Sequence, residues 1–176
     1  FEVQGALRAA ARHDGPVYIR IGKKGEPCIH QAVPDFEIGR AIRVGEGSDV
    51  CILGVGTILP NVMAAAELLA GSGVSASVYS FPCVKPLDED VLAEAAKKFP
   101  LIVTVEEHSI IGGVGSAVAE WMADAEINGA CSLLRIGLPD SILHEGGSQD
   151  YAREQLGLGP PTIAERTMAY LNGAKS

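Results

Sequence analysis

The sequence predicts a three-layer α/β domain with a mostly parallel mixed sheet of about five strands. Apolar, β-prone runs alternate along residues 39–176 with longer segments that have helical spacing. Such alternation is typical of βαβ units, in which right-handed crossovers cover both faces of a parallel sheet with helices. The composition agrees, because 47% hydrophobic and 20% charged residues are ordinary for a folded chain of 176 residues.

Composition also argues against several classes of function. A net charge of −8 and a pI near 4.9 disfavour a nucleic-acid partner, which would require clustered positive charge. No apolar run reaches membrane-spanning length, and the start does not resemble a signal peptide. The four cysteines form no CxxC pair, and Cys51 and Cys131 lie in strand-like runs. We therefore expect reduced core thiols in a cytoplasmic protein, in preference to a disulfide or a metal set.

The first 38 residues differ from the regular pattern that follows. Val3, Leu7 and Ala10 have helical spacing, and residues 17–21 are typical of a strand. One helix and one strand cannot bury a core alone, so we expect this part to pack on another body, with the preceding elements of its domain absent here. Residues 26–37 contain two prolines and little periodicity, which predicts an extended linker.

Five strands are expected in the regular part of the chain, at residues 40–44, 50–55, 75–81, 101–105 and 132–136. Because only a short turn joins the first two, the first strand is expected to be antiparallel to the second. Helices are expected between the later strands and at the end of the chain. Their expected N-caps are Thr57, Asp88 and Ser148.

Polar residues gather directly after the run at 101–105, as Glu106, Glu107, His108 and Ser109. The carboxyl ends of strands in an open α/β sheet are where ligands bind. Strand alternation places Glu106 and His108 on one face and Glu107 on the other. Because a metal site needs at least three ligands, the two residues that share a face are too few, and no metal ligand is expected. An acid/base cluster remains open, although the spacing favours a carboxylate that caps a helix or pairs across an interface.

Glycines mark two strand-to-helix turns. Gly54 and Gly56 invite a dinucleotide-binding interpretation, but a third glycine and a closing acidic residue are missing, which favours a plain tight turn. Gly112, Gly113 and Gly115 are expected to form the turn after Ser109. Gly113→Val is expected to unfold that turn if Gly113 has a positive φ.

Four segments resemble, in consistent order, the C-terminal domain of the transketolase family of thiamine diphosphate enzymes: GSDVCILGVGTILPNVMAAAELL, PLDEDVL, VTVEEHSIIGGVGSAVAE and RIGLPDSILHEGGSQDYAREQLGL. The EEHSIIGG form looks most like the short, two-part transketolases. There are two near alternatives. One is the 1-deoxyxylulose-5-phosphate synthases, and the other is the beta subunits of 2-oxoacid dehydrogenases, in which such a domain would dock a partner protein. The resemblance implies that residues 1–25 are the tail of a pyrimidine-binding domain, 26–38 a linker, and 39–176 the C-terminal domain.

The resemblance also implies an activity and its partners. The family moves a two-carbon ketol unit between sugar phosphates with thiamine diphosphate and Mg²⁺. This cofactor needs a GDG-type motif and an activating glutamate, and neither is found in these residues. We therefore expect no catalytic, cofactor-binding or metal-binding residue here, and no turnover by this chain alone. The implied partners are upstream pyrimidine- and diphosphate-binding domains or a separate subunit, sugar-phosphate substrates, and further copies in a homo-oligomer such as a dimer.

Individual residues receive expected roles from the same resemblance. The basic group at Arg20 and Lys23 could hold a phosphate or be a solvated edge, and residue spacing alone supports both equally. The family pattern favours phosphate, so the expected substrate-binding residues are Arg20, Lys23 and His108. The residues expected at a subunit interface or at the rim of the substrate channel are Glu106, Glu107 and Ser109.

Overall fold

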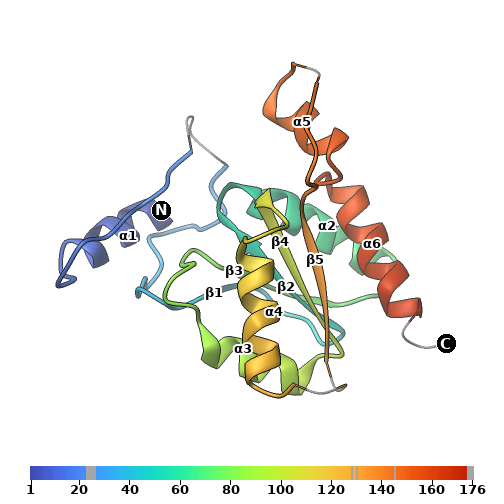
Figure 1. Ribbon diagram of the computed structural model, residues 1–176, viewed down its shortest axis with the longest axis horizontal. Coiled ribbons are helices and arrows are strands. Elements are labelled where there is room, and N and C mark those ends of the chain that lie inside the picture. The colour runs from blue at the N-terminus through green and yellow to red at the C-terminus, as the bar shows by residue number, and fades with distance from the viewer. Residues whose placement is uncertain (23–26, 128, 130, 145, 174–176) are drawn as a thin grey trace.

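The computed structural model describes residues 1–22, 27–127, 129, 131–144 and 146–173. In these ranges the elements are α1 (Glu2–Ala10), β1 (Ile42–Gly45), β2 (Val50–Val55), η1 (Gly56–Ile58), α2 (Leu59–Gly71), β3 (Ala76–Ser80), α3 (Glu89–Lys98), β4 (Leu101–Ser109), α4 (Val114–Asp124), β5 (Ser132–Leu138), α5 (Gln149–Gln155) and α6 (Pro160–Gly173). The strands form one five-stranded sheet in the order β1-β3-β2-β4-β5 (Figure 1). The predicted fold class is confirmed.

The sheet is parallel except for β1. β2 pairs in parallel with β3 on one side and with β4 on the other, and β5 extends the parallel part beyond β4. β1 is antiparallel, as predicted, but it pairs with β3, where Ile42 faces Ser80. The expectation that β1 lies beside β2 is wrong, because β3 and β4 already occupy both hydrogen-bonding edges of β2.

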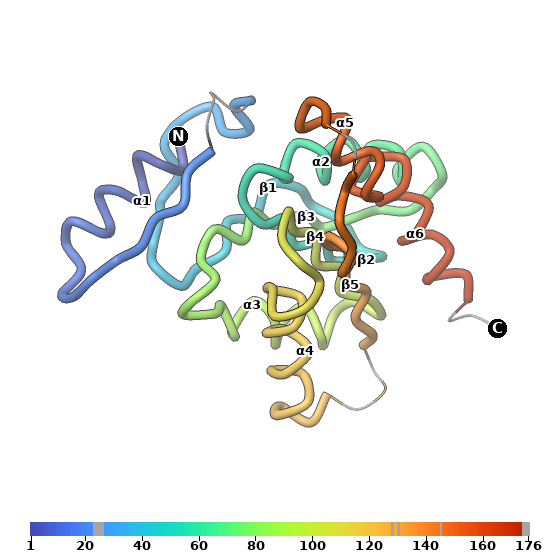
Figure 2. Tube along the Cα trace, turned by 45° about the horizontal axis from the view of Figure 1, so that its top comes forward, coloured from blue at the N-terminus to red at the C-terminus, as the bar shows by residue number. Residues whose placement is uncertain are grey.

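Two hydrophobic layers lie on opposite faces of the sheet. Alternate residues of β2 separate accordingly, with Val50 and Ile52 in one cluster and Cys51 and Leu53 in the other. The first cluster contains buried side chains of α2 and α6, and the second contains those of α3 and α4. Figure 2 shows α2 above the sheet, α6 at its right side, and α3 and α4 below it. This is the expected arrangement, with both faces of the sheet covered by helices.

The two cysteines expected in the core are both buried there. Cys51 and Cys131 belong to the cluster under α3 and α4, and all four cysteines are free thiols. Burial raises the pKa of the Cys51 thiol to about 12, so this side chain stays protonated at neutral pH. It behaves as a small hydrophobic residue, as predicted.

The N-terminal part stands beside the sheet, at the left of Figures 1 and 2. α1 confirms the first helix, and the following segment packs on it: His30 Nε2 lies 2.6 Å from Glu2 Oε1, and a Cβ at Gly5 would lie 2.6 Å from the Phe36 Cβ. The strand predicted at residues 17–21 is not formed. A strand requires a hydrogen-bonded neighbour, and the described part of the chain provides none there.

Side-chain caps begin two of the helices as expected. Asp88 accepts hydrogen bonds from the N–H of Val91 at 3.2 Å and of Ala41 at 2.6 Å, so it starts α3 and holds the residue before β1. Ser148 accepts from the N–H of Tyr151 at the start of α5. Thr57 does not cap α2, because it lies within η1 and its hydroxyl is directed elsewhere. Within the described ranges, no helix has the length and apolar character needed to cross a membrane.

The junction between β4 and α4 depends on a close approach of backbone and carboxylate. Glu106 Oε2 and Oε1 accept hydrogen bonds from the N–H of Val114 and Gly115, at 2.7 and 2.8 Å. Gly113 has φ −85°, so the expected positive φ is wrong for this residue; Gly112 has it, at +74°. Gly113 is required for space, since a Cβ there would lie 2.2 Å from Glu106 Oε2.

We expect Gly113→Ala to lower the free energy of unfolding by about 2 kcal/mol, because the displaced Glu106 carboxylate loses its hydrogen bonds to α4. Gly112→Asn is the matched control, because asparagine tolerates a left-handed conformation and a Cβ there meets nothing within 4 Å. The control is expected to cost less than about 1 kcal/mol. Urea unfolding of both variants measures the difference, and equal stabilities would contradict this account.

Candidate functional site

The candidate site lies at the carboxyl ends of β2 and β4. The connection after β2 leads toward β3, and the connection after β4 leads toward β5 on the other side, so the two chains diverge there. Such a switch point is where open α/β sheets usually bind a ligand. Glu106, Glu107, His108 and Ser109 all lie at this edge, as the last four residues of β4. They continue the strand beyond residue 105, where the predicted strand ended.

Glu106 is a buried carboxylate that interacts with the start of α4. Its side chain comes from the sheet face that α4 covers, and the residue is only 3% exposed. The N-terminus of a helix carries partial positive charge and unpaired N–H groups, which favour an anion. Glu106 supplies that anion from within the chain, so the N-terminus of α4 is not available to an external phosphate.

Glu107 is the centre of a second polar cluster, the Glu107–Arg153 network, which comprises Thr57, Glu107, Gln149, Asp150 and Arg153. Glu107 Oε1 accepts a hydrogen bond from Gln149 Nε2 at 2.7 Å. Its Oε2 accepts from Thr57 Oγ1 and from Arg153 Nη2, both at 2.8 Å. The network therefore joins the end of β4 to the β2–α2 turn and to α5.

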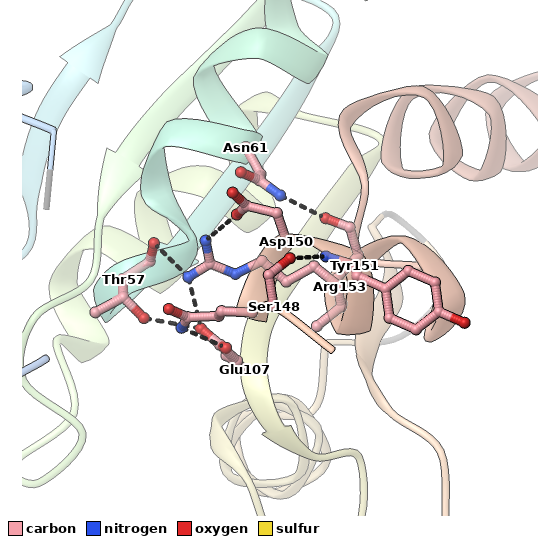
Figure 3. Close-up of polar contacts among 9 residues, drawn as sticks. Thr57, Asn61, Glu107, Ser148, Asp150, Tyr151 and Arg153 are labelled. Carbon is pink, nitrogen blue, oxygen red and sulfur yellow. Dashed lines mark hydrogen bonds and ion pairs between the residues drawn. The ribbon is translucent and has the colours of Figure 1, made fainter. Parts of the chain in front are cut away.

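Arg153 fills the space between these segments. Its side chain is 7% exposed, and Figure 3 shows the guanidinium between Thr57, Asp150 and Glu107, while the Tyr151 ring points away. Besides Glu107, Nη2 donates to the carbonyl oxygen of Thr57 at 3.1 Å, and Nη1 donates to Asp150 Oδ1 at 3.4 Å. The usual ligand position at the switch point is thus occupied by a side chain of the protein itself.

The network sets the ionisation of Glu107. Partial burial alone would raise the pKa of this carboxyl, but the hydrogen bonds from Arg153, Gln149 and Thr57, together with the charge of Arg153, lower it below its usual value. Glu107 is therefore an ionised, internally paired carboxylate at neutral pH. A general acid would need a raised pKa, so this group is not suited to that role.

His108 is the exposed member of the four polar residues. Its Nδ1 lies 3.2 Å from the carbonyl oxygen of Ser109, and the ring extends into solvent. Ser109 Oγ accepts from the N–H of Ile111 and so begins the turn toward α4. Arg135 of β5 supports that turn by donating to the carbonyl oxygen of Ile110 at 3.2 Å. These hydrogen bonds hold the backbone next to His108 in place, and its imidazole faces outward.

Of the two predicted basic residues, Arg20 is exposed in the extended segment beside the sheet and is not part of the Glu107–Arg153 network. Lys23 lies outside the described residues. In the described part of the chain, no three His, Cys, Asp or Glu residues are grouped in a way that could hold a metal ion.

Sequence reasoning missed Thr57, Gln149 and Arg153 as members of this site. Thr57 directly follows β2, and its position just after a predicted strand was a usable signal for it. Arg153 lies in α5, 46 residues after Glu107. No local pattern marked it as the buried residue of α5.

The pKa of Glu107 leads to a pH-dependent prediction. A carboxyl whose pKa is lowered on folding contributes stability above its usual value, here 4.5, and loses it as the pH falls through the folded value. We expect the wild type to be about 2 kcal/mol more stable than Glu107→Gln at pH 7, with the difference shrinking below about pH 4.5.

Denaturant unfolding at several pH values measures this difference. Glu120→Gln, on the exposed side of α4, is the control and is expected to change stability by less than about 0.5 kcal/mol at pH 7. A difference between the wild type and Glu107→Gln that stays constant from pH 7 to pH 3 would contradict the assignment.

Comparison with known proteins connects this geometry to a family. The family model "Transketolase, C-terminal domain" matches residues 39–163, which include the whole sheet and the Glu107–Arg153 network. A 1-deoxy-D-xylulose-5-phosphate synthase of Synechococcus sp. (strain RCC307) is 36% identical over 168 residues, which cover 94% of this chain and 26% of the synthase. A 6-deoxy-6-sulfo-D-fructose transketolase subunit of Clostridium sp. (strain MSTE9) is 38% identical over 157 residues, covering 89% of this chain and 48% of the subunit.

Solved structures agree with the sequence comparison. A split-gene transketolase, described as an inactive beta4 tetramer, superposes with a TM-score of 0.85 at 32% identity, covering 96% of this chain and 53% of that one. The chain therefore spans about half the length of this relative and of the transketolase subunit, and about a quarter of the synthase. The agreement of family model, relatives and fold shows that the chain belongs to the transketolase family and contains the C-terminal domain of that family.

Proposed function

We propose that this chain is the C-terminal portion of a transketolase-like transferase that moves a two-carbon ketol unit between sugar phosphates. The observation that carries the proposal is the carboxyl edge of the sheet: its two carboxylates are paired within the chain, and His108 is left exposed beside them. Such an edge is suited to shape and line an entrance, with the reacting groups supplied by another part of the enzyme. The likeness to a transketolase subunit supports this division.

The carboxyl edge of the sheet does not fit thiamine diphosphate or Mg²⁺. A diphosphate would need free N–H groups at a helix N-terminus, and those of α4 are bound to Glu106. Mg²⁺ would need carboxylate oxygens, and those of Glu106 and Glu107 are engaged in hydrogen bonds. We therefore propose that other parts of the complete enzyme hold the cofactor.

The N-terminal segment supplies a second part of the proposal. We propose that residues 1–25 are the tail of a pyrimidine-binding domain, that 26–38 are a linker, and that 39–176 are the C-terminal domain. Unpaired backbone at residues 17–21 supports this, since a strand-forming run without a neighbour is completed by an adjoining sheet. Large apolar side chains are also exposed throughout the segment: Phe1, Val3, Leu7, Val17, Tyr18 and Ile21.

The same segment suggests how the chain assembles. Its apolar surface fits a tight, permanent association with upstream pyrimidine- and diphosphate-binding domains or with a separate subunit. One structural relative is described as a tetramer of beta subunits that is inactive, which supports both a homo-oligomer and a requirement for further parts. We propose that this chain contributes subunit contacts and the rim of the substrate channel.

The proposal predicts a division of activity between parts. The complete enzyme, loaded with thiamine diphosphate and Mg²⁺, is expected to transfer a ketol unit from a ketose phosphate to ribose 5-phosphate, whereas this chain alone shows none. Product formation is followed by chromatography of the sugar phosphates. No transfer by a folded, cofactor-loaded complete enzyme would overturn the proposal.

The rival function is synthesis of 1-deoxy-D-xylulose 5-phosphate. The observation that favours it is the 36% identity to such a synthase over nearly the whole chain. The same preparation decides between the two, because this product and the transketolase products separate in one chromatographic run.

The proposed role of His108 at the rim of the substrate channel can be tested directly. We propose that its exposed ring contacts the sugar phosphate at the entrance, with Arg20 and Lys23 as further phosphate contacts. In the complete enzyme, His108→Asn is expected to raise KM for the ketose phosphate by about tenfold and to change kcat by less than about twofold, because the lost contact serves binding in ground and transition states alike. His144→Asn, an exposed histidine of the β5–α5 loop, is the matched control. Equal KM values for both variants would remove His108 from the site.

A further inference from the structure

Arg153 connects three segments that are distant in the sequence. Through Nη2 it binds Glu107 at the end of β4 and the carbonyl oxygen of Thr57 in the β2–α2 turn. Thr57 Oγ1 in turn binds the same Glu107 oxygen that Arg153 contacts, so the three groups form a closed triangle (Figure 3). None of these three residues can move relative to the other two without stretching a hydrogen bond.

We propose that Arg153 is a positioning residue that fixes the end of β4, residues 107–109, against the β2–α2 turn. In this role it sets where His108 meets the substrate, although it does not itself touch the substrate. This inference rests on the proposed function for the identity of the substrate; the positioning itself is a property of this chain.

The attachment of α5 does not depend on Arg153. Asn61 Nδ2 of α2 donates to the carbonyl oxygen of Leu158 at 2.9 Å, just beyond α5, and the Leu158 side chain is completely buried in the core. This second anchor connects the α5–α6 junction to α2 and to the core without using Arg153. Loss of the guanidinium is therefore expected to loosen the end of β4 without releasing the helix.

The chemistry of the site requires a guanidinium. Nη2 serves two acceptors that lie in different segments, while Nη1 reaches Asp150. Arginine holds its donors in a fixed planar fork, whereas a lysine ammonium is a point charge on a flexible stem. The Nε of Arg153 is buried without a hydrogen-bond partner in the described part of the chain.

Steady-state kinetics of the complete enzyme test the inference. Arg153→Ala is expected to raise KM for the ketose phosphate by about tenfold and to change kcat by less than about twofold. The size of the KM effect corresponds to the loss of one hydrogen bond to a charged group, here the contact between the displaced His108 and the substrate phosphate. Added methylguanidinium is expected to restore KM, because it can occupy the space that the truncated side chain leaves. Arg153→Lys is expected to fall between the wild type and Arg153→Ala and to show no rescue. Gln155→Ala, an exposed position of the same helix, is the control.

A merely structural role gives a different result. It would lower the amount of folded enzyme, so apparent kcat would fall while KM stayed constant and methylguanidinium had no effect. That outcome would overturn the inference. Should Arg153→Ala not fold, Arg153→Lys carries the same test through its KM.

Amide hydrogen exchange separates this inference from the proposed function. In Arg153→Ala, amides of residues 106–113 are expected to exchange about tenfold faster than in the wild type, while those of residues 50–53 in the core are unchanged. Faster exchange in an enzyme with no ketol-transfer activity would retain the positioning role and reject the proposed function. Unchanged exchange at residues 106–113 would reject the positioning role whatever the enzyme catalyses.

Discussion

The burial of the Glu106 carboxylate against the first turn of α4 is the constraint on which the carboxyl edge depends. A charge in a position that is only 3% exposed is unfavourable unless it is compensated, and two backbone N–H groups at a helix N-terminus provide that compensation. The contact requires a glycine at 113, because any side chain there would enter the space of the carboxylate. β4 itself continues to Ser109, which pairs with Leu138 of β5 after a register shift that begins beyond Val105, and Glu107 and His108 lie within that stretch.

The same edge shows how a fold that usually binds ligands can serve a different purpose. The N-terminus of α4 could bind an external anion, but it is occupied by Glu106. The space at the switch point is occupied by Arg153. Both are interactions of the chain with itself. The edge is therefore polar but has no free carboxylate among Glu106 and Glu107, which agrees with the proposed role of this edge at the rim of a channel.

Sequence reasoning succeeded where the physical cause is local. The run at 50–55 is buried on both faces, so its continuous hydrophobicity located β2 at its observed bounds. Asp88 was recognised because an N-cap acts within three residues. The expectation that a carboxylate after the run at 101–105 caps a helix is also confirmed, by Glu106 at the start of α4. Contacts between distant segments were not recoverable, because the 46 residues between Glu107 and Arg153 leave no local pattern that joins them. The strand at 17–21 failed because its local propensity was satisfied, but the described residues supply no neighbouring strand to pair with it.

That unpaired stretch has a practical consequence for anyone preparing the protein. Tyr18 is 88% exposed and Ile21 is 64% exposed, on backbone whose N–H and C=O groups are not part of any sheet. Such a segment is a template for edge-to-edge self-association, which grows with protein concentration and with time at elevated temperature. Under the proposed function, an adjoining sheet of the complete enzyme would pair with residues 17–21 and so remove this template.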